Sequence, residues 1–159
     1  FRHKDDRYVE IADRVCENGW FGQKTSKGYY LYGEGIDFLT PNPEIEVICS
    51  SERQRAGVVP KIFSDQEILD KYIAAMVYEG TKILQEKIAV RPSDIDVVYT
   101  NGYGFPKWRG GPMKYADMIG LDKILLNIQK FSEADSRFWS PPQLLIDLVD
   151  NNKNFDSLN

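Results

Sequence analysis

Two glycine-rich stretches carry the residues best suited to chemistry, and the first of them spans residues 19–32. It reads GWFGQKTSKGYYLY and sets Lys24 and Lys27 around two hydroxyl residues, with glycines on either side. Ammonium groups, hydroxyls and the backbone N–H groups of a glycine turn suit a phosphate or another anion. The spacing is shorter than that of a P-loop, so a solvated lysine turn without a ligand is the alternative, and spacing alone favours it.

The second stretch, residues 100–112, reads TNGYGFPKWRGGP and combines four glycines, two prolines, three aromatic residues and two cations. Glycine is used where the backbone takes a positive φ or where a neighbour approaches closely, and proline fixes φ. A loop this constrained between two predicted helices fits a binding site, and it fits equally a tight corner between packed helices. Composition alone favours the corner.

A complete catalytic apparatus is not visible in the sequence, which has no dinucleotide glycine fingerprint after a strand, no P-loop and no Gly-x-Ser-x-Gly turn. Its one histidine, His3, lies near the start, and its two cysteines, Cys16 and Cys49, lie far apart. These residues show no metal-ligand spacing and form no nucleophile pair. We therefore predict no catalytic residue and no metal ligand here. We expect both thiols to be free and buried, with a disulfide as the alternative.

Length and charge limit the class of protein. A chain of 159 residues is long enough for one domain, or for one domain and a small extension. The formal net charge of −4 argues against a general binder of nucleic acid or of anionic membranes. No apolar run approaches the roughly 18 residues of a membrane span. Because the chain starts with Phe1 and without a secretory pattern, we expect it to be a piece of a longer protein.

The elements that position the two stretches are predicted to be helices, so the expected fold class is all-α. Residues 27–32 are the one segment with strand-like character, an aromatic run that follows the lysines. The polar tail, residues 151–159, is expected to fray. Amphipathic spacing and terminal signals predict helices over residues 8–18, 44–56, 64–84, 92–99, 113–119, 121–131 and 143–149.

The longest predicted helix begins at a capping box, in which Ser64 accepts a hydrogen bond from the N–H of Glu67 and Glu67 reaches back. Behind it, apolar residues recur every three or four positions and predict one continuous stripe along residues 68–84. Gly80 belongs to the stripe, and because glycine is costly inside a helix we expect it to admit another backbone. Glu79 lies beside the stripe, where a functional carboxylate and a satisfied or solvated glutamate are both open, and the second is favoured.

Residues 19–30 resemble the signature Gly-x-Phe-Gly-x-Lys-Thr-Gly-x-Gly-Phe-Tyr, which ends the helical domain of L-3-hydroxyacyl-CoA dehydrogenases. Three later segments resemble the second helical repeat of the multifunctional β-oxidation enzymes, which carry enoyl-CoA hydratase and hydroxyacyl-CoA dehydrogenase activities on one chain. They read RPSDIDVVY (91–99), NGYGFP (101–106) and RGGPM (109–113). The motifs follow the order of that family over almost the whole chain. The chain is therefore identified as a member of this family, and the resemblance implies its C-terminal helical bundle.

The resemblance implies three parts in the chain. Residues 1–40 would be the end of the first helical repeat, with the Lys-Thr loop and a short extended segment, and residues 41–63 a linker helix and loop. Residues 64–159 would be the second repeat. The family oxidises L-3-hydroxyacyl-CoA to 3-ketoacyl-CoA with NAD, using a histidine–glutamate pair on a Rossmann domain. That domain would precede Phe1, so His3 is not the catalytic histidine, and this chain alone is expected to be inactive.

Two site residues follow from the resemblance. Lys24 matches the signature lysine, which the family places near the NAD site, so its ammonium would complement the negative charge of the cofactor. Tyr103 falls where the multifunctional enzymes place a substrate contact, which implies a contact with acyl-CoA. The sequence departs from the family at Ser26, where glycine is usual, so the turn is in doubt if a positive φ is needed. It also departs at Tyr78, because an asparagine commonly precedes Glu79.

The partners that the resemblance implies are the acyl-CoA substrate, the remainder of the same polypeptide, and a thiolase subunit or a second copy of the chain. The second repeat would pack its apolar stripe against the first repeat, and exposure of the stripe would drive self-association. The alternative function is a helical scaffold that holds a partner subunit. Residues 156–159 are not a Ser-Lys-Leu peroxisomal signal, so we expect a cytoplasmic protein, with the peroxisome as the alternative.

Overall fold

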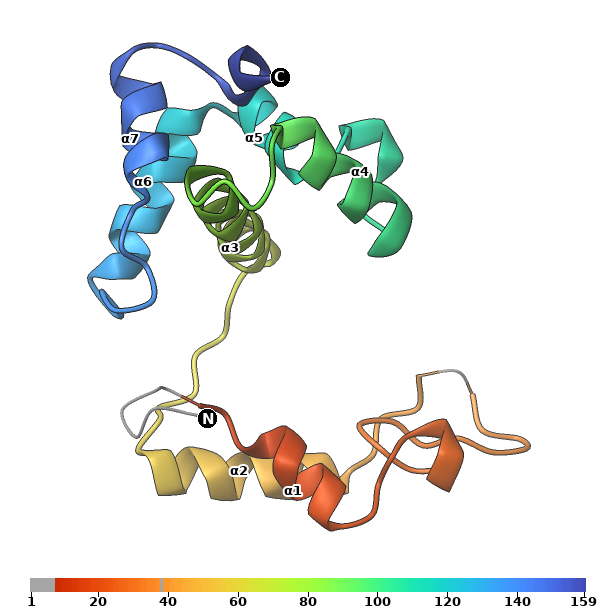
Figure 1. Cartoon of the computed structure of the whole chain (residues 1–159). Helices are drawn as coiled ribbons and strands as arrows, with labels where there is room; N and C mark the ends of the chain where they lie inside the picture. Colours follow the sequence, from red (N-terminus) through yellow and green to blue (C-terminus); the bar gives the residue numbers. More distant parts are fainter. Residues whose placement is uncertain (1–7, 38) are drawn as a thin grey trace. The chain divides into compact units, whose positions relative to one another are not determined.

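The chain divides into two compact units, Phe1–Ile62 and Phe63–Asn159, and the computed structural model describes residues 8–37 and 39–159 of it (Figure 1). The described residues contain seven α-helices and three 3₁₀ helices, with no β-strand beyond isolated bridges. The predicted all-α fold class is therefore confirmed. His3, which the sequence excluded as a catalytic residue, lies outside the described residues.

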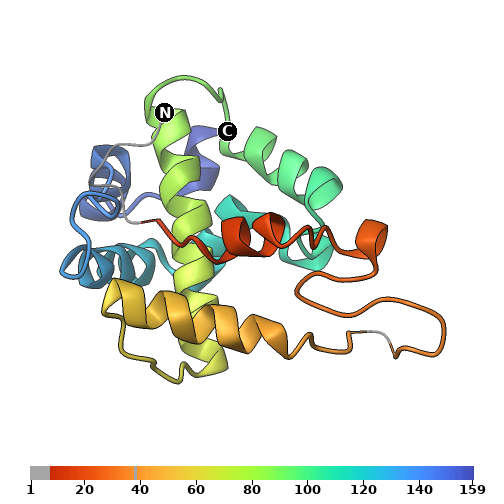
Figure 2. The same ribbon diagram turned by 90° about the horizontal axis from the view of Figure 1, so that it is seen from below.

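In the first unit, α1 (Ile11–Glu17) and α2 (Glu44–Ala56) lie side by side, as Figure 1 and Figure 2 show. The 3₁₀ helix η1 (Gln23–Thr25) follows α1. The predicted range of α2 is confirmed at both ends, because Pro43 precedes it and Gly57 ends it with a φ of 64°. The predicted helix over residues 8–18 is present as the shorter α1.

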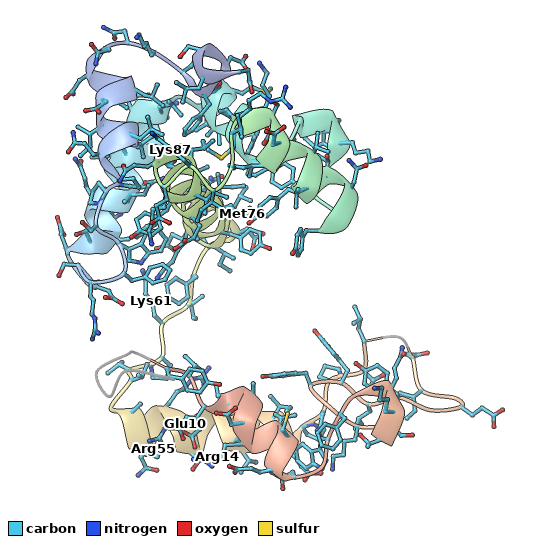
Figure 3. The ribbon with its side chains drawn as sticks, viewed as in Figure 1. Glu10, Arg14, Arg55, Lys61, Met76 and Lys87 are labelled. Atoms are coloured by element: carbon cyan, nitrogen blue, oxygen red, sulfur yellow. The ribbon has the colours of Figure 1, made fainter. Side chains whose placement is uncertain are left out.

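Ion pairs fasten α1 to α2. The Arg14 guanidinium lies 2.6 Å from Glu10 and 3.0 Å from Glu52. Glu52 also pairs with Arg55, at 2.7 Å. Figure 3 shows Glu10, Arg14 and Arg55 together at this contact. The hydrogen bonds that Arg55 and Arg14 donate lower the pKa of Glu52, which keeps this carboxylate ionised.

The two thiols are free, but the prediction that they are buried is wrong. Cys16 is exposed and Cys49 is half-buried. The reason is that charged residues hold the contact between α1 and α2, so little apolar surface is removed from water. Of the described residues in these two helices, only Val15 is buried.

The second unit is built around α3 (Asp65–Gln85), which contacts α4 (Pro92–Gly102), α5 (Pro112–Ile119), α6 (Leu121–Ser132) and α7 (Gln143–Asp150). In Figure 1, α3 lies between α4 on one side and α6 and α7 on the other. One apolar core joins all five helices. Its largest fully buried side chains are Phe155, Met113, Ile124, Ile128, Leu145 and Val77.

The predicted capping box at the start of α3 is confirmed. The Ser64 Oγ accepts the N–H of Glu67 at 3.2 Å, and the Ser64 N–H donates to the Glu67 carboxylate at 2.9 Å. This reciprocal pair satisfies two backbone groups at the helix start and contributes about 1 kcal/mol to helix stability.

The apolar stripe of α3 is continuous in sequence but not in burial. Ile73 and Val77 are buried, whereas Ile68 is 56% exposed and Tyr72 is 66% exposed. The first two turns of α3 therefore present an apolar surface, while the later turns supply the core.

Two expectations about the middle of α3 have different outcomes. The neighbour that packs closely against Gly80 is a side chain and not a backbone, because a Cβ at Gly80 would lie 2.6 Å from the Met113 sulfur. The expectation of a close backbone was wrong, since α5 reaches α3 through Met113. Glu79 is exposed and lies 3.8 Å from Lys82, in agreement with a solvated glutamate.

The tail of the chain is packed, so the prediction that residues 151–159 fray is wrong. The 3₁₀ helix η3 (Phe155–Leu158) carries Phe155, which is 1% exposed. The Asp117 carboxylate accepts the N–H groups of Phe155 and Asp156, at 2.8 and 2.9 Å. One aromatic side chain and one carboxylate on α5 thus hold a segment whose composition is otherwise that of a frayed end.

Candidate functional site

The first glycine-rich stretch folds into a turn that closes on itself. Gly22 donates its N–H to the Lys27 carbonyl at 2.9 Å, and Lys27 donates its N–H to the Gly22 carbonyl at 3.1 Å. A Cβ on Gly28 would lie 2.9 Å from the Gly22 Cα. The strand character predicted for residues 27–32 is reduced to isolated β-bridges. Both glycines are therefore required by the turn itself, with or without a ligand.

Ser26 keeps this turn intact although the signature that the stretch resembles has glycine at the same position. Its φ is 58°, so the position does require the left-handed region. A serine reaches this region at a cost of about 1–2 kcal/mol. The surrounding hydrogen bonds are formed nonetheless. The Thr25 N–H, for example, donates to the Gly22 carbonyl at 3.1 Å.

Lys24 is the cation of this turn that is available to an external anion. Lys27 is occupied, because its ammonium pairs with Glu44 and lies 4.2 Å from the centre of the Trp20 ring. Lys24 is exposed on η1, and the hydrogen bonds and ion pairs of the described residues leave its side chain unpaired. The N–H groups of residues 25–28 donate within the turn. An anion here would therefore meet the Lys24 side chain and not a ring of amides.

The second glycine-rich stretch forms a corner between α4 and α5 and is less irregular than predicted. α4 continues to Gly102, and the 3₁₀ helix η2 (Lys107–Arg109) occupies the middle of the stretch. Asp96 on α4 reaches the start of α5, where its carboxylate accepts the N–H groups of Met113 at 2.8 Å and Lys114 at 3.1 Å. A side chain of one helix therefore caps the next one.

Asp96 is the one buried carboxylate among the described residues, with 8% of its surface exposed. Burial raises the pKa of Asp96, and the two N–H groups that it accepts act in the opposite direction. A carboxyl group with a raised pKa is often an acid–base catalyst. Here both oxygens are engaged by the backbone of α5, so Asp96 has a structural role.

An open groove with a volume of about 690 Å³ lies between α3 and the corner. Tyr103 lines it, is 75% exposed, and has its ring 5.5 Å from the ring of Tyr99. Met76, labelled in Figure 3, belongs to the α3 wall. Grooves of this size with mainly apolar walls hold small ligands, so this is the candidate ligand site of the second unit. Its lining residues include Leu69, Tyr72, Ile73, Met76, Glu79 and Phe105.

Arg109 also lines the groove, and sequence reasoning did not single it out. Its guanidinium lies 4.4 Å from the centre of the Trp108 ring and 4.2 Å from that of the Tyr115 ring. The available signal was a cation beside aromatic residues in a constrained loop. The sequence did not reveal that α3 forms the opposite wall, because that contact joins residues far apart in the chain.

The two predicted site residues belong to different units, Lys24 to the first and Tyr103 to the second, so each is assigned with its own surroundings. Within residues 8–37 and 39–159, no cluster of three or more His, Cys, Asp or Glu side chains is placed to hold a metal ion. Over the same residues, no helix has both the length and the apolar character needed to cross a membrane.

Comparison with known proteins finds a matching protein family and several similar proteins. Residues 68–156, more than half of the chain, match the family described as 3-hydroxyacyl-CoA dehydrogenase, C-terminal domain. A peroxisomal bifunctional enzyme of Danio rerio is 42% identical over 151 residues, which are 93% of this chain and 21% of the relative. A peroxisomal fatty acid beta-oxidation multifunctional protein of Oryza sativa subsp. japonica is 35% identical over 141 residues, 86% of this chain and 19% of the relative. The fatty acid oxidation complex subunit alpha of Psychrobacter sp. (strain PRwf-1) is 28% identical over 143 residues, 90% of this chain and 20% of the relative.

The chain spans about one fifth of the length of these curated relatives. The matched region, residues 68–156, includes every residue that lines the groove. The resemblance inferred from the motifs is thereby confirmed. The relatives of the chain are bifunctional and multifunctional β-oxidation proteins. The chain belongs to the 3-hydroxyacyl-CoA dehydrogenase C-terminal domain family.

Proposed function

We propose that the chain is part of a 3-hydroxyacyl-CoA dehydrogenase that oxidises L-3-hydroxyacyl-CoA to 3-ketoacyl-CoA with NAD in fatty-acid β-oxidation. The family match of residues 68–156 is the observation that carries the proposal. In this proposal residues 1–159 supply no catalytic residue. The histidine–glutamate pair and most of the NAD site belong to a Rossmann domain in the rest of the polypeptide.

Lys24 is the residue proposed to contact NAD. Its exposure and its lack of an ionic partner among the described residues support this role, because a paired ammonium would gain little from a phosphate. The turn around it is closed by hydrogen bonds between Gly22 and Lys27, so the ammonium is presented from a fixed backbone. The dinucleotide diphosphate supplies the negative charge that this cation complements.

Tyr103 is the residue proposed to contact acyl-CoA. It lines the groove beside α3, and its hydroxyl is carried by a ring that is mostly exposed. The apolar wall formed by Leu69, Ile73 and Met76 fits the alkyl part of such a substrate.

The three-part division of the chain remains part of this proposal, with residues 1–40 ending the first repeat, 41–63 linking and 64–159 forming the second repeat. The exposed apolar turns at Ile68 and Tyr72 support packing of the second repeat against the rest of the polypeptide. The names of the Danio and Oryza relatives support the peroxisome over the cytoplasm as the location.

The test is steady-state kinetics of the full-length polypeptide with a Lys24→Ala substitution. We expect the KM for NAD to rise about tenfold, the effect of losing one charge-assisted contact, with a small change in kcat. Lys123→Ala on the exposed face of α6 is the matched control and should leave the KM unchanged. An unaltered KM in Lys24→Ala would remove the role given to Lys24. Residues 1–159 alone should oxidise no 3-hydroxyacyl-CoA, and turnover by them would contradict the assignment of the catalytic pair.

A scaffold function is the second candidate, in which the helical surface holds a partner such as a thiolase subunit. The name of the Psychrobacter relative, a subunit of a complex, supports it. Size-exclusion chromatography of the chain with a candidate thiolase separates the two functions. A stable complex formed without NAD or acyl-CoA favours the scaffold, and binding of these ligands without a complex favours the dehydrogenase.

A further inference from the structure

The groove between α3 and the corner has two chemically different ends. Tyr115, whose ring contacts Arg109, also lines a small cavity with Leu69 and Ile73, so Arg109 lies near the Leu69 end of α3. Glu79 lines the same groove further along α3. From Leu69 to Glu79 the helix advances about 15 Å, at 1.5 Å per residue. A cation and a carboxylate thus mark opposite ends of an apolar floor.

Among the residues that the structure describes, Arg109 has no acidic partner, unlike Arg14, Arg53, Arg55 and Arg91, which form ion pairs with carboxylates. The ion pairs and hydrogen bonds of the described residues include none of the Arg109 side chain, whose contacts are with the rings of Trp108 and Tyr115. Contacts over ring faces leave the N–H groups at the edge of the guanidinium plane for an acceptor.

We propose that this groove binds an apolar chain that ends in a negatively charged head group, with the head group on the Arg109 guanidinium. The apolar chain of the ligand lies along the α3 wall, where Leu69, Ile73 and Met76 are among the apolar residues that line the groove. The Arg109 end is favoured for the anion, because the opposite end carries the Glu79 carboxylate, whose charge is only partly offset by Lys82 at 3.8 Å. The inference rests on the proposed function for the class of ligand, an acyl compound, and adds the residue that recognises its charge.

The same head-group chemistry has two sources, the carboxylate of a free fatty acid and the phosphates of an acyl-CoA. A guanidinium donates two parallel hydrogen bonds to either anion. The groove lies entirely within residues 69–109, so this chain contains all of the residues that the inference requires. Binding is therefore expected of the 159-residue chain itself.

The experiment is isothermal titration calorimetry of the 159-residue chain with dodecanoate, dodecanoyl-CoA, coenzyme A and dodecanol, each below its micelle concentration. We expect one binding site per protein molecule for dodecanoate or dodecanoyl-CoA, which combine an anionic head group with an alkyl chain. Coenzyme A and dodecanol should bind much more weakly. Arg109→Gln should weaken the anionic ligands about tenfold or more, the range for a lost charge-assisted contact. Arg53→Gln on α2 is the matched control, and it should bind with the affinity of the unsubstituted chain. Circular dichroism confirms that each variant is folded.

The outcomes separate the sources and the proposals. Binding of both anions shows that a carboxylate is sufficient, whereas binding of dodecanoyl-CoA alone assigns the head group to the phosphates. Either result supports the inference if Arg109→Gln removes the preference for these anionic ligands over dodecanol. Binding of dodecanol with the same affinity as dodecanoate and dodecanoyl-CoA overturns it. So does an Arg109→Gln variant with unchanged affinity. Full-length kinetics in which Lys24→Ala still raises the KM for NAD would then leave the proposed dehydrogenase function standing.

Discussion

The Asp96 carboxylate and the backbone of Gly111 lie so close that position 111 has no space for a side chain. A Cβ there would stand 2.3 Å from the Asp96 Oδ1. The φ of Gly111 is 108°, a value that side chains also disfavour. This approach lets Asp96 reach the N–H groups of Met113 and Lys114 and cap α5. The glycine before α5 is therefore explained by packing.

Gly111→Ala should destabilise the second unit by about 2–4 kcal/mol, because it strains the backbone and displaces the Asp96 cap. Urea unfolding followed by circular dichroism measures this change. Gly102→Ala is the matched control at the other end of the corner, where a Cβ meets nothing within 4 Å and φ is not positive. It should leave stability unchanged or raise it by up to about 1 kcal/mol. Equal effects of the two substitutions would contradict the account of Gly111.

Acid should loosen the contact between α1 and α2 through Glu52. Hydrogen bonds from Arg55 and then Arg14 lower the pKa of Glu52 below its ordinary value of 4.5. A depressed folded-state pKa means that the pairing stabilises the fold above the unfolded pKa, and that this stabilisation is lost as pH falls through the folded pKa. We expect the urea concentration at the unfolding midpoint to decrease once the pH is lowered below about 4.5. In Glu52→Gln the decline should be shallower, and an identical pH profile would show that the pairing contributes nothing.

The turn at Lys24 offers a stabilising substitution. Ser26 has a φ of 58°, where glycine is unstrained and an L-residue is not. Ser26→Gly should therefore raise stability by about 0.5–1 kcal/mol, the relief of strain less the entropy of glycine. Thermal unfolding measures it, with Ser50→Gly on α2 as the control that should destabilise instead. A loss of stability in Ser26→Gly would mean that the serine side chain is needed.

The elements predicted well are those whose signals are local. α2 is bounded by Pro43 and Gly57, and α3 starts at the reciprocal pair of Ser64 and Glu67. Such residues act on the backbone within one helical turn, so the helix ends can be predicted from the adjacent residues.

The features that sequence reasoning missed depend on contacts between distant residues. Phe155 is anchored by Asp117, and the composition of the tail gives no sign of it. The same holds for the groove, where Arg109 faces the start of α3 only after α5 has returned the chain to that helix. The roles of Lys24 and Tyr103 remain predictions that rest on the resemblance of the surrounding motifs to a family. The lysine and glycine spacing alone favours a solvated turn, and the composition of the second stretch favours a corner.

The apolar start of α3 should drive self-association of this chain. Ile68 and Tyr72 are more than half exposed on the same face of the helix. Ile68→Lys should shift sedimentation velocity profiles toward the monomer at concentrations where the unsubstituted chain associates. Val47→Lys, a similarly exposed residue on α2, is the control and should have no effect. A chain that is monomeric without substitution would remove the basis for this prediction.

Gly80 and Met113 should prove energetically coupled. A Cβ at Gly80 would lie 2.6 Å from the Met113 sulfur, so Gly80→Ala overpacks the contact between α3 and α5, at a cost of about 1–3 kcal/mol that exceeds the gain in helix propensity. Met113 is fully buried, so Met113→Ala alone should cost about 2–5 kcal/mol through the cavity that it leaves. In the double variant the new methyl group enters that cavity without a clash. Urea unfolding should therefore show a loss smaller than the sum of the two single losses by at least about 1 kcal/mol. Strict additivity would mean that α5 moves away from α3 in Gly80→Ala, and that the glycine does not set the distance between the two helices.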